Sequence, residues 1–245
     1  GGNPAVRKIV ERYYRLQPVK NFMDVWWGRA KLNYADGSPV RLSRWDHDYL
    51  NLFVDKVVNQ KKAPVFFELN EEEIKEGRRF QESIGVPLDE PFVCLHNREP
   101  GFLPDQNYHR HRDSDIDNFL PAIDYLLDEG FWVVRLGDPT MKPIPMKTRK
   151  LLDLPFMEHK HGLGDVWLSA RCVMFLGTSS GPLNIPKVFK NGPPRILTNW
   201  VHWPWPTFNQ QERYIPKIIR VPRQGNRMMT LDEKMFSWDK FWVTD

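Results

Sequence analysis

Beyond residue 63 the chain alternates between short apolar runs and longer segments whose apolar residues recur with helical spacing. The apolar runs predict strands at residues 65–67, 92–96, 131–136, 172–176, 195–198 and 218–221. The helical spacing predicts helices at residues 70–85, 115–129, 163–171 and 182–190. Apolar runs without polar interruption, such as 92–96, are typical of parallel strands buried on both faces. Strands that alternate with helices indicate an α/β domain with a mostly parallel, Rossmann-like sheet.

The first 62 residues lack this alternation. Residues 4–16 and 46–58 have helical character, whereas residues 22–34 are rich in aromatic side chains without a clean period. We therefore predict an N-terminal helical or irregular segment at residues 1–62 and a Rossmann-like domain at residues 63–245.

Several helices of the second part carry capping signals. Asn70 is followed three residues later by Glu73, which is the spacing of a capping box at the start of a helix. Gly85 and Gly130 stand where the first two helices are predicted to end, as is typical of glycine after a helix.

Polar residues gather directly after the predicted strands. These segments are His96-Asn97-Arg98-Glu99, Gly137-Asp138, Gly177–Gly181 and Asn199-Trp200. In open parallel sheets ligands bind at the carboxyl ends of the strands, so the sequence predicts a binding site at this edge.

The turn Gly177-Thr178-Ser179-Ser180-Gly181 joins a predicted strand to a predicted helix. Its backbone N–H groups, together with the positive end of the helix, would bind an anion such as phosphate. The alternative is a tight turn with a good N-cap. The turn also satisfies the G-x-S-x-G pattern of hydrolases, but residues 180–201 contain no Asp or Glu before His202. The order Ser, acid, His therefore cannot be met, which argues strongly against that class.

Arg98 and His96 follow a predicted buried strand and would point to the same side. A guanidinium at this position could hold a phosphate in bidentate fashion. The alternative for Arg98 is a salt bridge to Glu99 or Asp138. His96 could orient a leaving group, or it could be a hydrogen-bonded histidine of the core.

Composition narrows the possible classes of function. The 245 residues are 41% hydrophobic and include ten Trp, which suffices for a sizeable core. The net charge of +4 fits an acidic ligand or an anionic membrane surface, but no dense Lys and Arg run interleaved with aromatics indicates nucleic-acid binding. The sequence contains neither a Walker A motif nor a G-x-G-x-x-G after a strand, which argues against an NTPase or a nicotinamide oxidoreductase.

Neither the cysteines nor the histidines form a familiar metal pattern. Cys94 and Cys172 lie in apolar runs and are predicted to be buried thiols, which favours a reducing compartment. The string His109-Arg110-His111-Arg112 fits no zinc spacing and reads as a charged loop that leads into a helix cap.

With these residues assembled, the chain resembles a family of bacterial glycosyltransferases linked to surface-polysaccharide synthesis. It is more distantly similar to the GDP-fucose-dependent fucosyltransferases of the GT-B class. The matching segments are Phe92–Phe102 (FVCLHNREPGF), Tyr108–Leu126, Trp132–Pro139 (WVVRLGDP), Asp165–Gly181 and Leu197–Trp200. The resemblance covers roughly residues 65–220 and implies a GT-B-type nucleotide-sugar-binding domain with a reduced acceptor-side part.

The resemblance also implies roles for the residues that match. His96-Asn97-Arg98 matches the H-x-R element that holds the donor diphosphate, the Ser179–Ser180 pair would cradle phosphate, and Asp165 would face the nucleobase. Gly177, Thr178, Asp138 and Asn199 complete the expected substrate-binding set. The relatives carry a Glu several residues after the arginine as general base, and the nearest equivalents here are Asp105 and Glu99.

An enzyme of this kind would transfer a sugar from a nucleotide-diphosphate donor, with GDP favoured, to a glycan or lipid-linked glycan. The resemblance implies an inverting reaction that needs no metal or other cofactor, because arginine and backbone N–H groups offset the charge of the leaving group. It implies a cytoplasmic protein, at the inner face of the membrane or near it. The alternative is a non-catalytic nucleotide-sugar-binding module, or half of an enzyme that needs a partner domain.

Overall fold

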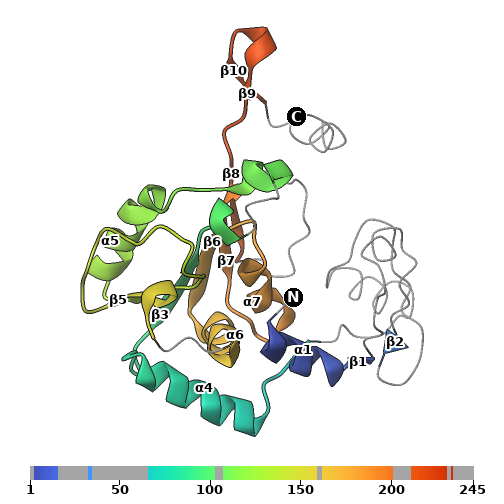
Figure 1. Cartoon of the computed structure of the whole chain (residues 1–245), viewed down its shortest axis with the longest axis vertical. Coiled ribbons are helices and arrows are strands. Elements are labelled where there is room, and N and C mark those ends of the chain that lie inside the picture. Colours follow the sequence, from blue (N-terminus) through green and yellow to red (C-terminus); the bar gives the residue numbers. More distant parts are fainter. Residues whose placement is uncertain are drawn as a thin grey trace. The chain divides into compact units, whose positions relative to one another are not determined.

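The computed structural model describes residues 3–15, 33–34, 66–102, 107–158, 162–200, 211–230 and 233 (Figure 1). The chain divides into two units. One comprises residues 1–74 with 188–190, and the other comprises residues 75–187 with 191–245. The predicted division at residue 62, and the idea that residues 1–62 are the remnant of an acceptor-side domain, stay predictions.

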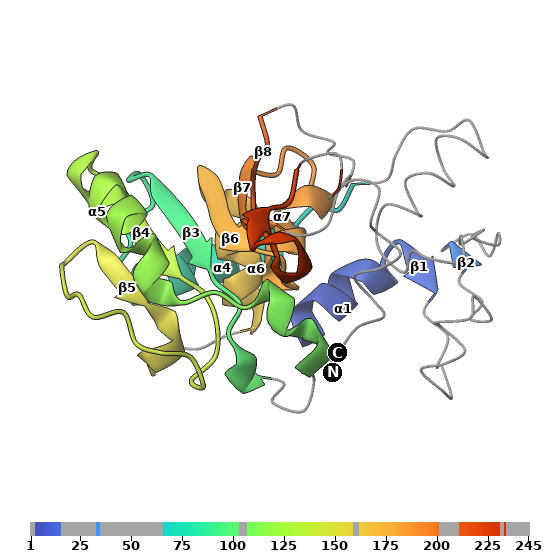
Figure 2. The same ribbon diagram turned by 90° about the horizontal axis from the view of Figure 1, so that it is seen from above.

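A parallel sheet of six strands forms the centre of the second unit. Its strands are β3 (Phe92–His96), β4 (Trp132–Arg135), β5 (Leu151–Asp153), β6 (Met174–Thr178), β7 (Arg195–Trp200) and β8 (Arg213–Pro216). They lie in the order β5-β4-β3-β6-β7-β8, which Figure 2 shows from left to right. The chain runs outward from β3 to β5, then returns to the other side of β3 and runs outward again to β8. This is the strand order of the Rossmann fold, which confirms the predicted α/β class.

The helices of this unit follow the predicted alternation. They are α4 (Glu71–Ser83), α5 (Leu120–Asp128), α6 (Gly162–Arg171) and α7 (Ile185–Val188). Short 3₁₀ helices are η2 (Pro100–Phe102), η3 (Asn107–Arg112), η4 (Ile116–Phe119), η5 (Leu154–Phe156) and η6 (Pro182–Asn184). The capping box before α4 is confirmed: the Glu73 N–H donates to Asn70 Oδ1 and the Asn70 N–H donates to Glu73 Oε2, both at 2.8 Å.

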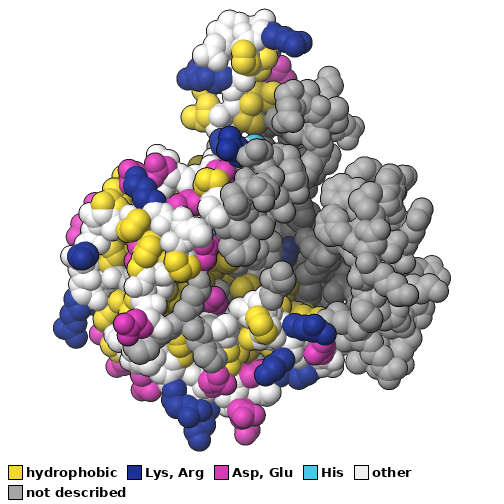
Figure 3. Space-filling model, in the orientation of Figure 1, with side chains coloured by type: hydrophobic (Ala, Val, Ile, Leu, Met, Phe, Trp, Pro, Cys, Tyr) yellow, Lys and Arg dark blue, Asp and Glu magenta, His cyan; other side chains and the backbone are white. Residues whose placement is uncertain are grey.

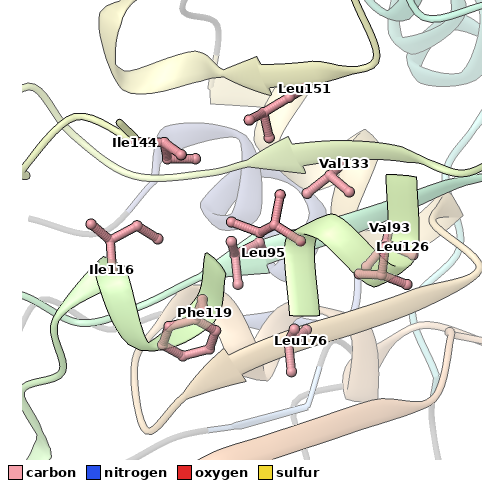
Figure 4. Close-up of a cluster of buried hydrophobic side chains, with 10 residues drawn as sticks. Val93, Leu95, Ile116, Phe119, Leu126, Val133, Ile144, Leu151 and Leu176 are labelled. Carbon is pink, nitrogen blue, oxygen red and sulfur yellow. The ribbon is translucent and has the colours of Figure 1, made fainter. Parts of the chain in front are cut away.

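Helix α5 and η4 cover one face of the sheet. The core between these helices and the sheet is drawn in Figure 4. It contains Val93, Leu95, Ile116, Phe119, Ile123, Leu126, Val133, Ile144, Leu151 and Leu176. All five residues of β3 are buried, as predicted for a central strand. Cys94 alternates with Val93 and Leu95 and therefore points to the opposite face. Burial and the neighbouring Cys172 thiol raise the pKa of Cys94, and both cysteines are buried and free, as predicted.

Helices α4 and α6 pack closely through two reciprocal contacts. Gly77 of α4 lies directly under the ring of Trp167, and Gly164 of α6 lies directly under the ring of Phe80. Trp167 is 3% exposed, and its Nε1–H donates to Gln81 Oε1 at 2.9 Å. These contacts fix α6 in place, and α6 leads directly into β6.

Several sequence-based boundaries are corrected by the structure. The strand predicted at 172–176 lies at 174–178, and the helix predicted at 182–190 is a 3₁₀ turn followed by the single turn α7. Pro186 would stand in the second turn of a continuous helix from residue 182, where it lacks the N–H that would bond to the Pro182 carbonyl, so the helix is interrupted there. Strand β5 is only three residues long, and β8 is largely exposed and ends in a proline. For these reasons the sequence pattern predicted neither strand.

The strand predicted at 218–221 is not part of the parallel sheet. Only Arg220–Val221 (β9) is extended, and it pairs with β10 (Arg227–Met228) in a separate antiparallel ribbon. Both strands of this ribbon are largely exposed. The prediction at 218–221 was wrong because its apolar residues have the composition of a sheet strand.

The first unit contains α1 (Pro4–Glu11) and the short pair β1 (Tyr14–Arg15) and β2 (Asn33–Tyr34). Within it, Arg12 binds Glu73 at 2.7 Å, and the Tyr13 ring lies 5.0 Å from that of Phe67. Phe67 pairs with Phe189 as an isolated bridge, in place of the strand predicted at 65–67. The helix predicted at 46–58 and nearly all of the aromatic segment 22–34 lie outside the described residues.

The α4–α6 packing leads to a stability prediction. Gly77→Ala places a methyl group inside the Trp167 ring position, so we expect a loss of about 1–3 kcal/mol despite the better helix propensity of Ala. Gly181→Ala is the control, since its φ is −59° and no atom lies within 4 Å of the added Cβ. Urea unfolding of both variants measures the difference, and equal stabilities would contradict the packing role.

Candidate functional site

The topological switch point of the sheet lies between β3 and β6, where the chain leaves the two strands toward opposite edges. His96 pairs with Gly177 at the end of this ladder. A Cβ at Gly177 would lie 2.6 Å from the His96 carbonyl oxygen, so only glycine permits this close approach. One residue further on, the Arg98 N–H donates to Thr178 Oγ1 at 2.7 Å. The two predicted elements, H-x-R and the Ser-rich turn, therefore lie side by side.

The Arg98 guanidinium is enclosed at this point. It forms an ion pair with Asp113, and the two side chains are only 13% and 19% exposed. The sequence offered Glu99 or Asp138 as the ionic partner of Arg98. The partner is instead Asp113, which follows the charged segment 109–112. Partial exclusion of water strengthens the attraction between the guanidinium and the Asp113 carboxylate.

The segment that carries Asp113 crosses the carboxyl edge. It is hydrogen-bonded to residues at or just beyond the ends of β3, β7 and β8. The Ser114 N–H donates to the Arg98 carbonyl at 2.9 Å, after β3. Asn199 Nδ2, in β7, donates to the Asp113 carbonyl at 2.9 Å. Beyond β8, Lys217 Nζ reaches the His111 carbonyl at 2.8 Å, and burial lowers the pKa of Lys217. Arg98 is thus held against a carboxylate whose backbone is itself fixed.

Asn199 has an unusual conformation within β7. Its φ is +52°, in the left-handed region, and the register to β8 shifts between Leu197 and Trp200. Asparagine tolerates this region better than other non-glycine residues, but the position still costs free energy. The Asn199 amide donates to the Arg112 and Asp113 carbonyls at 3.3 and 2.9 Å, and its expected contact with substrate stays a prediction.

Ser179 and Ser180 directly follow β6 at the switch point. Ser179 is 8% exposed, and Ser180 Oγ is buried without a hydrogen-bond partner within the described part of the chain. A buried hydroxyl without a partner is costly unless a water or a ligand meets it. The positive helix end expected after this turn is not there, because η6 and α7 are too short to carry a substantial macrodipole. The turn can therefore offer hydroxyl and N–H groups, but little helix charge.

Arg135 organises the other half of the edge, after β3, β4 and β5. Its side chain is 0% exposed, and Nη2 donates to Glu99 Oε1 at 2.8 Å. Nη1 lies 2.6 Å from the Lys142 carbonyl and 3.4 Å from Asp153 Oδ1, and Nε donates to Asn97 Oδ1 at 3.2 Å. Burial raises the pKa of Asp153, against the effect of the guanidinium. Sequence reasoning missed Arg135, since it lies inside an otherwise apolar strand.

These contacts bear on the expected general bases. Glu99 accepts hydrogen bonds from Arg135, from Asn97 Nδ2 at 2.8 Å and from the Lys142 N–H at 2.7 Å. A carboxylate with three donors is poorly suited to receive a proton, which favours a structural role. Asp105 lies outside the described residues. Its role as base stays a prediction.

Asp138 and Asp165 lie at the same edge in different ways. Asp138 follows β4 and accepts hydrogen bonds from the N–H and the hydroxyl of Thr140, at 3.0 and 2.5 Å. Asp165 stands in the first turn of α6 and is half-buried. Helices between parallel strands run antiparallel to them, so this turn belongs to the carboxyl edge. Their expected contacts with substrate stay predictions.

His96 is a histidine of the core. Its ring is 8% exposed, and Nδ1 lies 3.0 Å from the Leu136 carbonyl. Burial lowers the pKa of His96 to about 4, so the ring is neutral at pH 7. A neutral Nδ1–H donor to Leu136 links the ends of β3 and β4, and any role at the leaving group would be through neutral Nε2.

The described residues contain neither a metal-binding cluster nor a membrane-spanning helix. Among those residues no group of three or more His, Cys, Asp or Glu could hold a metal ion. No helix within the described part of the chain is both long and apolar enough to cross a membrane.

Comparison with known proteins gives little beyond the geometry. No family model matches the chain, and no curated protein matches it. A solved structure that does match is a glycosyl transferase of family 9 from Veillonella parvula, at 17% identity and a TM-score of 0.49. The match covers 72% of this chain and 50% of that one, so the chain spans about half the length of that protein. A likeness this distant assigns no function, which is inferred below from the residues of the site.

The burial of His96 makes stability depend on pH. Between pH 4 and 6.5 the unfolded chain binds more protons at this residue than the folded chain, so stability falls as the pH falls. From pH 7 to pH 5 the loss at His96 is about 2 kcal/mol. His96→Gln should remove this share, which urea unfolding at the two pH values would measure. The same pH dependence in both proteins would contradict a buried neutral ring.

Proposed function

We propose that the chain binds a nucleotide-diphosphate sugar at the β3–β6 switch point and acts as a GT-B-like glycosyltransferase. One observation carries this proposal: Arg98 and the Ser179–Ser180 turn flank the switch point of a Rossmann-ordered sheet, joined by the hydrogen bond to Thr178. Dinucleotides and related phosphates bind at this point in open α/β sheets.

A diphosphate at the switch point would meet complementary groups. The enclosed guanidinium of Arg98 would offset one of the negative charges, and the Ser180 hydroxyl, which lacks a partner in the described part, would donate to a phosphate oxygen. The phosphate must compete with the Asp113 carboxylate for Arg98. Binding is therefore an exchange of one anion for another at the same cation, so the diphosphate must gain more at this site than the displaced Asp113 loses.

The proposed reaction breaks the bond between the anomeric carbon and the diphosphate oxygen. The acceptor hydroxyl oxygen attacks that carbon from the opposite side, which inverts its configuration, and a base takes the hydroxyl proton. Arg98 would stabilise the departing diphosphate, so that no metal is required. We place Asp165 and Asn199 toward the nucleotide, with GDP as the favoured donor, and Asp105 remains the candidate base.

We further propose a glycan or a lipid-linked glycan as the acceptor, and a cytoplasmic site of action at the inner face of the membrane. The resemblance to enzymes of surface-polysaccharide synthesis and the net charge of +4 support this proposal.

The proposal predicts that Arg98→Ala abolishes nucleotide-diphosphate binding. A charge-assisted contact to phosphate contributes about 1.5–3 kcal/mol, so affinity should fall by at least about tenfold. Calorimetric titration with GDP, UDP, ADP and CMP, with and without a divalent metal, measures it. Arg149→Ala is the matched control, because Arg149 is exposed and lies in the turn before β5, at the opposite end of that strand from the carboxyl edge.

The outcomes of the titration separate the proposals. Metal-independent binding of one diphosphate that is lost in Arg98→Ala and kept in Arg149→Ala would support the donor site. Unchanged affinity in Arg98→Ala would refute it.

A second candidate is a non-catalytic nucleotide-sugar-binding module, or a half-enzyme that needs a partner domain. It is favoured by the engagement of Glu99 with Arg135, of Asp113 with Arg98 and of Asp138 with Thr140. Sugar transfer or donor hydrolysis by this chain alone would exclude the module.

A further inference from the structure

Beyond β8 the chain leaves the sheet and forms a two-stranded ribbon, here called the β9–β10 ribbon and defined as residues 218–229. It lies above the sheet in the view of Figure 1. Arg220 pairs with Met228 and Val221 pairs with Arg227, and the Met229 N–H donates to the Ile219 carbonyl at 2.7 Å, which extends the ladder. Gly225, with φ +65°, makes the turn.

The ribbon and its approach are strongly basic. Residues 213–230 contain five Lys and Arg and no Asp or Glu. Lys217 points inward to the His111 carbonyl, whereas Arg220, Arg223 and Arg227 are exposed. Arg227 is paired with Glu233 at 2.6 Å, so the exposed ribbon keeps an excess of positive charge after that pair is counted.

Large apolar side chains stand beside these cations. Alternation along the extended ladder puts Ile218, Arg220 and Met228 on one face of the ribbon. Ile218 is 67% exposed and Met228 is 59% exposed. Figure 3 shows hydrophobic and basic side chains side by side at this end of the molecule. The other face of the ladder carries half-buried Ile219, Val221 and Met229.

The chemistry of this face selects among possible partners. A specific protein interface buries about 800 Å² on each side and has few charges at its centre. A basic ribbon of some twelve residues cannot supply a surface of that size and composition. Single-stranded nucleic acid would need aromatic side chains for stacking, and residues 218–229 contain none. An anionic bilayer offers phosphate groups for cations and, just below them, an apolar layer for short side chains.

We propose that the β9–β10 ribbon docks the protein on an anionic membrane surface. Arg220 and Arg223 contact lipid phosphates, while Ile218 and Met228 enter the boundary between headgroups and acyl chains. The proposal does not rest on glycosyl transfer, since it uses no residue of the switch point. The net charge of the chain first suggested a membrane, and this proposal names the surface that would contact it.

Co-sedimentation of the full chain with lipid vesicles tests this surface. We expect binding to phosphatidylcholine vesicles that contain phosphatidylglycerol, weaker binding to pure phosphatidylcholine, and release by salt. Basic residues near such a surface contribute about 1 kcal/mol each, so Arg220→Glu with Arg223→Glu should lower the partition coefficient by about 30-fold or more.

The control is Arg78→Glu with Arg79→Glu, both exposed on α4. Each pair of reversals changes the net charge from +4 to 0, since each substitution removes two units, so only the position of the charges differs. The control should retain most of the binding. Ile218→Ser with Met228→Ser should weaken the binding that persists at high salt. Circular dichroism checks that every variant folds.

Three results would overturn the proposal. They are failure of the unmodified chain to bind anionic vesicles, equal losses in the ribbon and α4 variants, and full binding by the Ile218→Ser, Met228→Ser variant at every salt concentration. Arg98→Ala serves as a further comparison: nucleotide binding lost there with vesicle binding intact would show that the two surfaces are independent.

Discussion

The buried guanidinium of Arg135 is the constraint on which the site depends. A charge with 0% exposure is tolerated only where its donors are met, and here the partners come from three different strand ends. Glu99 follows β3, Asp153 ends β5, and the Lys142 carbonyl belongs to the loop after β4. Removing Arg135 would leave two carboxylates facing each other in a site from which water is largely excluded. These contacts of Arg135 therefore fix the geometry of the carboxyl edge more than they add to the free energy of unfolding.

A second buried pair lies at the amino ends of β7 and β8, where Arg195 begins β7 and Glu212 directly precedes β8. Arg195 Nε lies 2.5 Å from Glu212 Oε1, and Arg195 Nη1 donates to the Leu183 carbonyl at 3.1 Å, which anchors the turn after Ser180. Burial beside Glu212 raises the pKa of Tyr214 to about 12, so its hydroxyl stays protonated and can donate to that carboxylate. The Arg135 contacts and the Arg195 bond to the Leu183 carbonyl therefore hold loops on both sides of Arg98 and Thr178. A site between fixed loops can bind a ligand without a large entropy cost for ordering them.

The sequence was sufficient for the features that depend on local pattern. The uninterrupted apolar run 92–96 predicted β3, and the Asn70–Glu73 spacing predicted the capping box of α4, because each needs only neighbours in the chain. It was insufficient where tertiary contacts decide. Strand β5 is formed by pairing with β4 and has no signal of its own. Apolar residues at 218–221 predicted a sheet strand, although an edge ribbon and a core strand share the same composition. The ion pair of Arg98 with Asp113 joins residues fifteen positions apart, and no spacing rule reaches it.

Asp113 changes how the proposed anion site should be understood. The sequence offered Arg98 either as a phosphate ligand or as the partner of Glu99 or Asp138, whereas in the structure it forms an ion pair with Asp113. An unpaired guanidinium at 13% exposure would lose much of its hydration, so the carboxylate stabilises Arg98 while no ligand is present. A diphosphate would have to offer more than Asp113 does, either through its second charge or through the Ser180 hydroxyl, which is buried without a partner in the described part of the chain. The Ser180 hydroxyl, two residues after the Thr178 that Arg98 contacts, therefore matters as much as the arginine itself, because a monoanion that reached Arg98 alone would gain little over the carboxylate it displaced.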